Sequence, residues 1–215
     1  MRRFIFDCAR HGETDNTPGR HLTDRGRMQA ERMAFTLRGT PYSLVLHSDT
    51  ERTRDTAQIM ARVLGVSESP MCFPPLNVIG TEDGENPALP IIPFEVAKTT
   101  AQAGRAHTET PAFDWFQGWG WVAGARRFKI ELAMAKAVYF LTTNPWLATQ
   151  IEDLDEVFVL IVSHSPFVEL RASDPRAQMC LGPCDAIRYT MEETAEGLLV
   201  LREEPQMTFR CPEVE

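Results

Sequence analysis

The stretch RRFIFDCARHGET, residues 2–14, joins an apolar segment directly to an arginine, a histidine and a glycine. The apolar part predicts a strand over residues 3–8, so that Arg10, His11 and Gly12 follow its carboxyl end. Two interpretations are open. Arg10 and His11 are the first polar residues of a surface loop in which Gly12 makes the turn, or they form a ligand site at the edge of a sheet, where α/β proteins bind their ligands.

Further apolar runs, separated by helical patterns, continue along the chain. Strands are predicted over residues 3–8, 43–47, 157–162, 186–191 and 197–201. Two of these runs are continuous in β-branched or aliphatic residues, as is typical of strands buried on both faces. Strands that alternate with helices predict an α/β fold, a three-layer α/β/α arrangement with a largely parallel central sheet.

Local signals mark three helices between these strands. Thr23 is the expected N-cap of the first, and Gly39 follows as its stop; its apolar stripe consists of Ala30, Met33, Ala34 and Leu37. The second is expected to open at the capping-box pattern SDTE, residues 48–51, with Ser48 as its cap, and to close at Gly65. A third helix is expected around 124–142; the residues expected on its apolar face are Leu132, Ala135, Val138 and Tyr139.

The length of 215 residues favours one domain, residues 1–215, with an irregular insertion at 66–123. This insertion contains the aromatic stretch FDWFQGWGW, residues 113–121, which includes three of the four tryptophans of the chain. A long irregular segment in a compact domain is often functional. Two interpretations are open, a satellite aromatic core or a cap that closes over the strand ends.

Composition narrows the class of protein. The chain is 43% hydrophobic and 24% charged, as in ordinary globular proteins, and its net charge of −8 disfavours binding to nucleic acid or to anionic lipid. Five scattered cysteines without a zinc-binding pattern suggest free thiols in a reducing compartment. The sequence contains no evident signal peptide or membrane span, so a cytoplasmic location is expected.

Chemistry-bearing residues follow three of the predicted strands. Arg10 and His11 follow the first, Arg52 lies in the first turn of the helix after the second, and His164 follows the strand at 157–162. If these strands are neighbours, two histidines and two arginines converge at one edge of the sheet. Taken singly, Arg52 could be solvated and His164 could be a core histidine. A bound anion would explain why a cation lies at a helix N-terminus, which itself favours anions.

Together these motifs resemble the histidine phosphatase superfamily. The matching elements are ARHGET after the first strand, LTDRG at the first helix, S-x-x-x-R-T-x-x-T-A at the second and SH after a late strand. The branch with phosphoglycerate mutases, fructose bisphosphatases and small phosphohistidine phosphatases is the most similar. The resemblance covers roughly residues 1–64 and 155–202, which hold the ordered set of motifs.

The resemblance implies a role for each of four residues. His11 would attack phosphorus through a neutral ring nitrogen, Arg10 and Arg52 would hold the phosphoryl oxygens as planar forks, and His164 would stabilise the charge that builds on them. Water would then hydrolyse the phosphohistidine, and we expect neither a metal ion nor another cofactor to be required. Three further residues are expected to contact substrate: Asn16, Thr17 and Ser165.

The chain departs from the family pattern at three places, one of which is the short loop TPGRH, residues 17–21, which lacks the tryptophan-containing segment of the mutases. Asn16 comes one residue early, so that Thr17 occupies its usual position. The family's acid would fall at Val78; nearby carboxyl groups that could replace it as proton donor are Glu82, Asp83 and Glu85. A missing acid hinders the release of an alkoxide more than the release of an imidazole.

These observations predict a metal-independent phosphatase that hydrolyses a phosphomonoester or a phosphohistidine through an enzyme phosphohistidine. Its expected partners are a small phosphorylated substrate or a phosphohistidine protein. Two alternatives stay open, a phosphotransferase of the phosphoglycerate mutase type and a phosphate-binding module that has lost the general acid.

Overall fold

The computed structural model describes residues 2–15, 17, 20–76, 123–164, 168, 181–202 and 208–214, with the backbone only for 123–129. The strands are β1 (Arg3–Arg10), β2 (Tyr42–His47), β3 (Met71–Cys72), β4 (Glu156–Ser163), β5 (Ala186–Glu193), β6 (Leu199–Leu201) and β7 (Thr208–Phe209). They form one sheet in the order β3-β2-β4-β1-β5-β6, and β7 also pairs with β5. The pairs from β3 to β1 are parallel and the pairs made by β5 are antiparallel.

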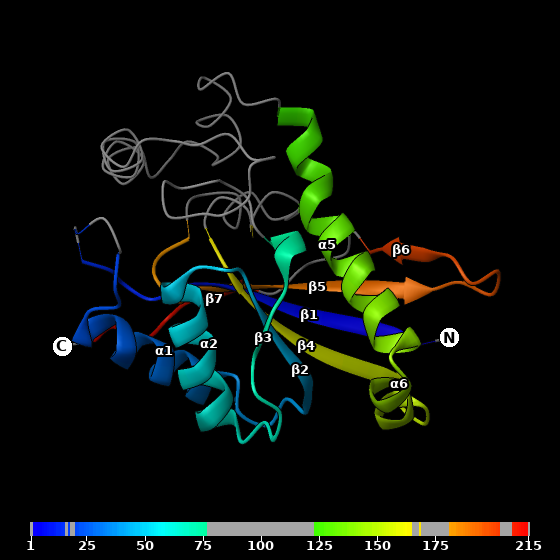
Figure 1. Cartoon of the computed structure of the whole chain (residues 1–215), viewed down its shortest axis with the longest axis horizontal. Helices are drawn as coiled ribbons and strands as arrows, with labels where there is room; N and C mark the ends of the chain where they lie inside the picture. Colours follow the sequence, from blue (N-terminus) through cyan, green and yellow to red (C-terminus); the bar gives the residue numbers. More distant parts are fainter. Residues whose placement is uncertain are drawn as a thin grey trace.

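Helices cover both faces of this sheet (Figure 1). Helices α1 (Asp24–Thr36) and α2 (Glu51–Leu64) lie together on one face. Helices α5 (Ala123–Thr143) and α6 (Pro145–Ile151) and the short 3₁₀ helix η1 (Pro74–Leu76) lie on the other. The predicted three-layer α/β architecture with a mostly parallel central sheet is therefore confirmed.

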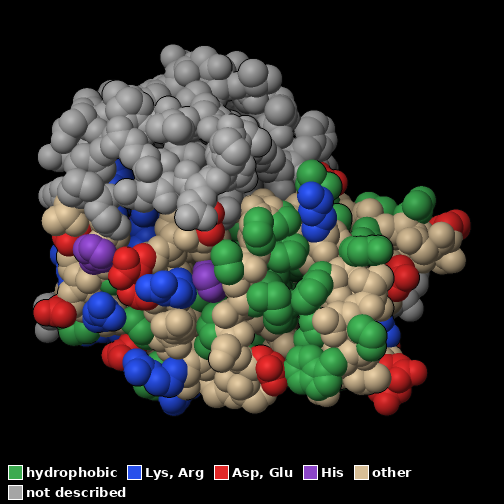
Figure 2. All heavy atoms as spheres, viewed as in Figure 1, with side chains coloured by type: hydrophobic (Ala, Val, Ile, Leu, Met, Phe, Trp, Pro, Cys, Tyr) green, Lys and Arg blue, Asp and Glu red, His purple; other side chains and the backbone are tan. Residues whose placement is uncertain are grey.

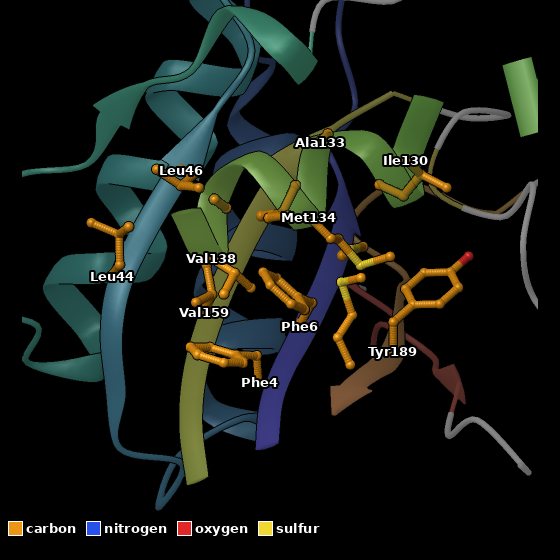
Figure 3. Packing of buried hydrophobic residues seen from close by; sticks show 14 of the residues in the cluster. Phe4, Phe6, Leu44, Leu46, Ile130, Ala133, Met134, Val138, Val159 and Tyr189 are labelled. Atoms are coloured by element: carbon orange, nitrogen blue, oxygen red, sulfur yellow. The ribbon is translucent and has the colours of Figure 1, made fainter. Parts of the chain in front are cut away.

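Each face of the sheet has its own apolar core. On β1 the side chains alternate, because successive residues of a strand point to opposite faces. Phe4 and Phe6 belong to the cluster under α5, whereas Ala9 belongs to the cluster under α1 and α2. Figure 3 shows Phe4 and Phe6 beneath α5, next to Met134 and Val138.

The helix predicted around 124–142 exists, but its predicted buried face is correct only in part, since Val138 is buried as expected. The buried residues of α5 are Ile130, Ala133, Met134, Ala137, Val138 and Leu141. Leu132 and Tyr139, expected inside, are 53% and 70% exposed. The helix is apolar on most sides, so hydrophobic periodicity could not select the face that the sheet covers. Figure 2 shows apolar side chains gathered at the surface over α5 and α6.

The predicted helix ends are confirmed in part. Thr23 caps α1 by accepting a hydrogen bond from the Gly26 N–H, and Gly65 ends α2 in the left-handed conformation with φ of 72°. Ser48, however, does not cap α2, which begins at Glu51 with Thr50 as its N-cap. The Ser48 hydroxyl donates to Thr53 Oγ1 at 3.0 Å instead, so a hydroxyl–hydroxyl contact replaces the capping box.

The segment predicted as an irregular insertion begins with regular structure. Residues 71–76 form β3, which pairs with β2, and η1, whose Leu76 is fully buried. Residues 77–122 lie outside the described part of the chain, and with them the aromatic stretch 113–121 and the hypothesis of a cap. Among the described residues, no helix is long and apolar enough to cross a membrane.

Two glycines bring the loop after β1 against the start of α1. A Cβ atom at Gly26 would lie 2.1 Å from the Glu13 carbonyl oxygen, and one at Gly12 would lie 2.5 Å from the Gly26 oxygen. Such distances are well inside van der Waals contact, so only glycine fits at either position. This mutual approach explains why the RHG and LTDRG motifs need a glycine each.

We predict that Gly26→Ala destabilises the protein, although Gly→Ala in a helix normally stabilises by up to about 1 kcal/mol. The added methyl group must displace the Glu13 backbone, so we expect a loss of roughly 1–3 kcal/mol in the free energy of unfolding. Chemical denaturation measures it. Arg27→Ala, at the neighbouring exposed position, is the control and should change stability by less than about 0.5 kcal/mol. A stabilised Gly26→Ala would contradict the close approach.

Candidate active site

The predicted constellation forms where three neighbouring parallel strands end. β2, β4 and β1 are adjacent in the sheet, and their carboxyl ends lead into α2, His164 and His11 respectively. In the β1–β4 ladder Arg10 is the register partner of Ser163, so the histidines that follow both strands come side by side. Their ring centroids are 5.2 Å apart and the rings are inclined by 70°.

Two backbone carbonyl oxygens accept hydrogen bonds from His11. Its N–H donates to the Ser163 carbonyl at 3.0 Å, which continues the ladder by one residue. Its ring Nδ1 lies 2.7 Å from the carbonyl oxygen of Gly12. Since a carbonyl oxygen can only accept, Nδ1 carries the proton, and the neutral ring keeps a lone pair on Nε2. His11 is therefore oriented as a nucleophile would be.

His164 is tied to the start of α2 through a chain of hydroxyl groups. Its Nε2 lies 3.0 Å from Ser48 Oγ, which in turn donates to Thr53 Oγ1. Thr53 donates to the carbonyl of Ser48 at 2.8 Å, so the direction of the chain makes Nε2 of His164 the donor. Ser48 and Thr53 are fully buried. The remaining nitrogen, Nδ1, can donate to an anion only when His164 is protonated.

The electrostatic environment keeps both histidines neutral. Burial, followed by the positive charge of Arg52, holds the pKa of His11 well below its usual value of 6.5, and His164 and Arg10 act in the same direction. Burial and then Arg52 and Arg10 likewise lower the pKa of His164. Arg20 also lowers the pKa of His164, so a third guanidinium, which sequence motifs did not indicate, acts on the site.

The two predicted arginines flank the histidines. Arg52 is the second residue of α2 and is 8% exposed. Arg10 ends β1, and its guanidinium donates to the carbonyl of Leu181, while its backbone N–H donates to the carbonyl of Asp185 at 2.9 Å. A buried arginine beside an N-terminal helix turn and next to two neutral histidines produces a strongly anion-attracting site.

Supporting residues come from both helices under the loop. Gly12 N–H donates to Thr56 Oγ1 at 3.1 Å, and Glu13 N–H donates to Gln29 Oε1 at 2.9 Å. Thr56 was noted beside Arg52 in the sequence, but the roles of Gln29, Ser48 and Asp185 were missed. Asp185 lies far along the chain from the backbone that it contacts, and nothing in the local sequence indicates that contact.

The remaining predicted site residues are less informative. Thr17 is exposed, and its hydroxyl donates to Asp15 Oδ1 at 2.7 Å, so its predicted contact with substrate stays a prediction. The other predicted residues, Asn16, Ser165, Glu82 and Asp83, lie outside the described ranges. Within those ranges no three His, Cys, Asp or Glu residues are grouped so that they could hold a metal ion.

His11, two arginines and His164 lie together at the edge of a mostly parallel sheet, which is the arrangement expected from the resemblance to the histidine phosphatase superfamily. Residues 8–71 match the family model described as histidine phosphatase superfamily (branch 1). This match confirms the predicted resemblance to that superfamily. It also confirms the prediction that the protein is an enzyme of the phosphatase type, as a statement about the family. No curated protein sequence matches the chain.

Solved structures share the fold. "Mycobacterial hydrolase 2" is 18% identical with a TM-score of 0.61, covering 100% of this chain and 94% of that one. A mycobacterial glucosyl-3-phosphoglycerate phosphatase complexed with VO3 is 18% identical with a TM-score of 0.53, covering 94% and 98%. A phosphoglycerate mutase from Bacillus anthracis str. Sterne is 11% identical with a TM-score of 0.55, covering 94% and 92%.

We predict that His11 and His164 titrate below pH 6.5, because burial and the arginines oppose their protonation. A histidine with a lowered pKa in the folded state binds fewer protons than in the unfolded state. The free energy of unfolding should therefore fall as pH drops below about 6.5, by at most about 1.4 kcal/mol per pH unit for each histidine.

Imidazole proton and nitrogen resonances followed by NMR between pH 8 and pH 5 measure both midpoints. The free energy of unfolding of His164→Gln, measured over the same range, should depend less steeply on pH than that of the parent. Midpoints of His11 and His164 at or above the usual histidine value of about 6.5 would contradict this account of the site.

Proposed function

We propose that this protein is a metal-independent phosphatase that hydrolyses its substrate through a phosphohistidine on His11. The observation that carries the proposal is the neutral His11 ring, whose Nδ1 donates to Gly12 O at 2.7 Å and whose Nε2 keeps its lone pair. Its surroundings also support it, because Arg10, Arg52 and His164 lie where they lower the pKa of His11. The same groups would attract a phosphoryl dianion.

In the first step, Nε2 of His11 attacks phosphorus in line with the bond to the leaving group. Arg10 and Arg52 hold the equatorial oxygens and neutralise their charge, which is the main contribution a protein makes to phosphoryl transfer. The Gly12 carbonyl stabilises the positive charge that the ring gains, because Nδ1–H already donates to it. The bond from phosphorus to the leaving group breaks, and phosphorus becomes bonded to Nε2.

In the second step, water attacks the phosphohistidine and returns His11 to its neutral form.

His164 takes part once the anion is bound, since a phosphoryl dianion favours protonation of the ring nitrogen that Ser48 does not occupy. The imidazolium then donates to a phosphoryl oxygen. Proton uptake by His164 thus accompanies binding of the dianion.

The substrate class is inferred from the positive charge of the site and from the residue that stands in place of the family's acid. We infer a small phosphomonoester or a phosphohistidine protein as partner, with phosphohistidine favoured where Val78 stands in place of an acid. A related fold occurs in a glucosyl-3-phosphoglycerate phosphatase and in a phosphoglycerate mutase. Hydrolysis rather than mutase chemistry is inferred because Thr17 replaces the asparagine expected of mutases.

Free cysteines and the acidic composition support a cytoplasmic location.

We predict that His11→Ala lowers turnover of an aryl phosphate, and of a phosphohistidine peptide, by at least about 1,000-fold, because the nucleophile is lost. A rapid quench with labelled substrate should trap an acid-labile, base-stable phosphoprotein in the parent and none in the variant. His21→Ala, an exposed histidine paired with Glu51, is the control and should keep both the activity and the trapped intermediate.

Two results would refute the mechanism. One is near-parental activity in His11→Ala. The other is a parent protein that binds vanadate but turns over neither substrate, which would identify a phosphate-binding module instead of an enzyme.

We further predict that Arg52→Lys weakens binding of vanadate and phosphate by roughly 10- to 100-fold, since the charge is kept but the bidentate fork is lost. Isothermal titration or inhibition kinetics measures the change. Arg62→Lys, at the exposed end of the same helix, is the matched control and should bind vanadate as the parent does. Unchanged vanadate affinity in Arg52→Lys would place Arg52 outside the anion site.

A further inference from the structure

A tight turn at residues 182–185 supports the strand end that carries Arg10 and His11. Asp185 N–H donates to Gly182 O at 3.1 Å and closes the turn. From this turn, the carbonyl of Asp185 accepts from Arg10 N–H at 2.9 Å, and Cys184 N–H donates to His11 O at 3.3 Å. The turn is thus hydrogen-bonded to the backbone of both residues.

Cys184 occupies an unfavourable position for its residue type. Its φ is 61°, and with Pro183 before it the turn has the sequence positions of a type II turn, where glycine is favoured third. A non-glycine residue in the left-handed region costs roughly 1 kcal/mol or more. Cys184 nevertheless buries its side chain fully, in the cluster under α1 and α2.

Cys184 lies close to another cysteine, Cys211, which follows β7. The two thiols are near enough to interact electrostatically, since Cys211 is one of the groups that raise the pKa of Cys184. The residue after Cys184 contacts the same segment directly: Asp185 Oδ2 pairs with Arg210 Nη1 at 2.5 Å, and Asp185 Oδ1 accepts from Cys211 N–H at 2.8 Å. Cys184 belongs to the cluster under α1 and α2, and Cys211 packs against it.

We propose that Cys184 and Cys211 are a dithiol pair that a small disulfide such as oxidised glutathione converts to a disulfide, which locks the C-terminal segment onto the turn beneath Arg10 and His11. Cys211, the partly exposed partner, attacks one sulfur of the small disulfide and releases one small thiol. Cys184 then attacks Sγ of Cys211, forms the new S–S bond and releases the second small thiol. Two protein thiols are oxidised, one small disulfide is reduced, and their two protons end on the released thiols.

The pKa values of the two thiols limit the rate of this exchange. Burial and the neighbouring Asp185 carboxylate raise the pKa of Cys211 to about 11, and burial together with Cys211 raises the pKa of Cys184 well above its usual value. The thiolate is the attacking species, so oxidation is slow at neutral pH and accelerates roughly tenfold per pH unit below pH 11. The pair therefore responds to sustained oxidation and not to brief exposure.

The test incubates the full chain with oxidised glutathione at pH 7.5, 8.5 and 9.5, alkylates the remaining thiols and maps peptides without reduction. We expect a 184–211 cross-linked peptide that forms about tenfold faster with each pH unit. The melting temperature of the oxidised protein should rise by roughly 5 °C or more, since the bond constrains the unfolded chain, and dithiothreitol should reverse the rise.

Two variants make the result decisive. Cys72→Ser removes an exposed free thiol and should leave the cross-link and the rise in melting temperature unchanged. Cys211→Ser keeps the turn and Cys184 and should abolish both. The proposal is overturned if Cys184 becomes linked to another cysteine, if Cys211 stops at the mixed disulfide with glutathione, or if the cross-linked protein melts no higher than the reduced one.

Discussion

The hydrogen bond from His11 N–H to the Ser163 carbonyl, at the end of the β1–β4 ladder, is the contact on which the site depends. It extends the parallel register by one residue beyond the Arg10–Ser163 pair. Because of that register, the two histidines leave adjacent strands at the same height, and their rings meet at 5.2 Å. A register shift of one residue would turn the side chains of β1 to the opposite faces and separate the pair.

The rest of the fold keeps this strand end in place from three sides. α1 supports the loop through the approach of Gly26 to Glu13, α2 supports it through Thr56, and the turn at 182–185 supports it through backbone hydrogen bonds. The contacts of Thr56 and of the turn satisfy backbone groups that would otherwise be buried without a partner. These supports hold the strand end in the position that the proposed phosphoryl transfer would require.

Much of this arrangement could be predicted from local sequence. The strand at 3–8, the Thr23 cap and the Gly65 stop depend on nearby residues, and all three were found. The convergence of Arg10, His11, Arg52 and His164 could also be predicted, because parallel strands bring their carboxyl ends to one edge of a sheet. The buried face of α5 and the role of Ser48 could not, since an evenly apolar helix and a short hydroxyl side chain accept several partners.

The sequence by itself determined the alternation of strands and helices and the residue types placed at the strand ends, because hydrophobic period and caps act within a few residues. Only the tertiary structure decided how buried polar groups are satisfied. Asp7, in the middle of a strand, is fully buried and accepts from Arg188 at 2.8 and 2.7 Å and from Tyr42 at 2.5 Å. Likewise the Asp185 carboxylate pairs with Arg210 and accepts from Cys211 N–H, and His164 is hydrogen-bonded to Ser48. These partners lie far apart in sequence, and the free energy of leaving a charge or a polar atom buried and unpaired selects them only once the chain has folded.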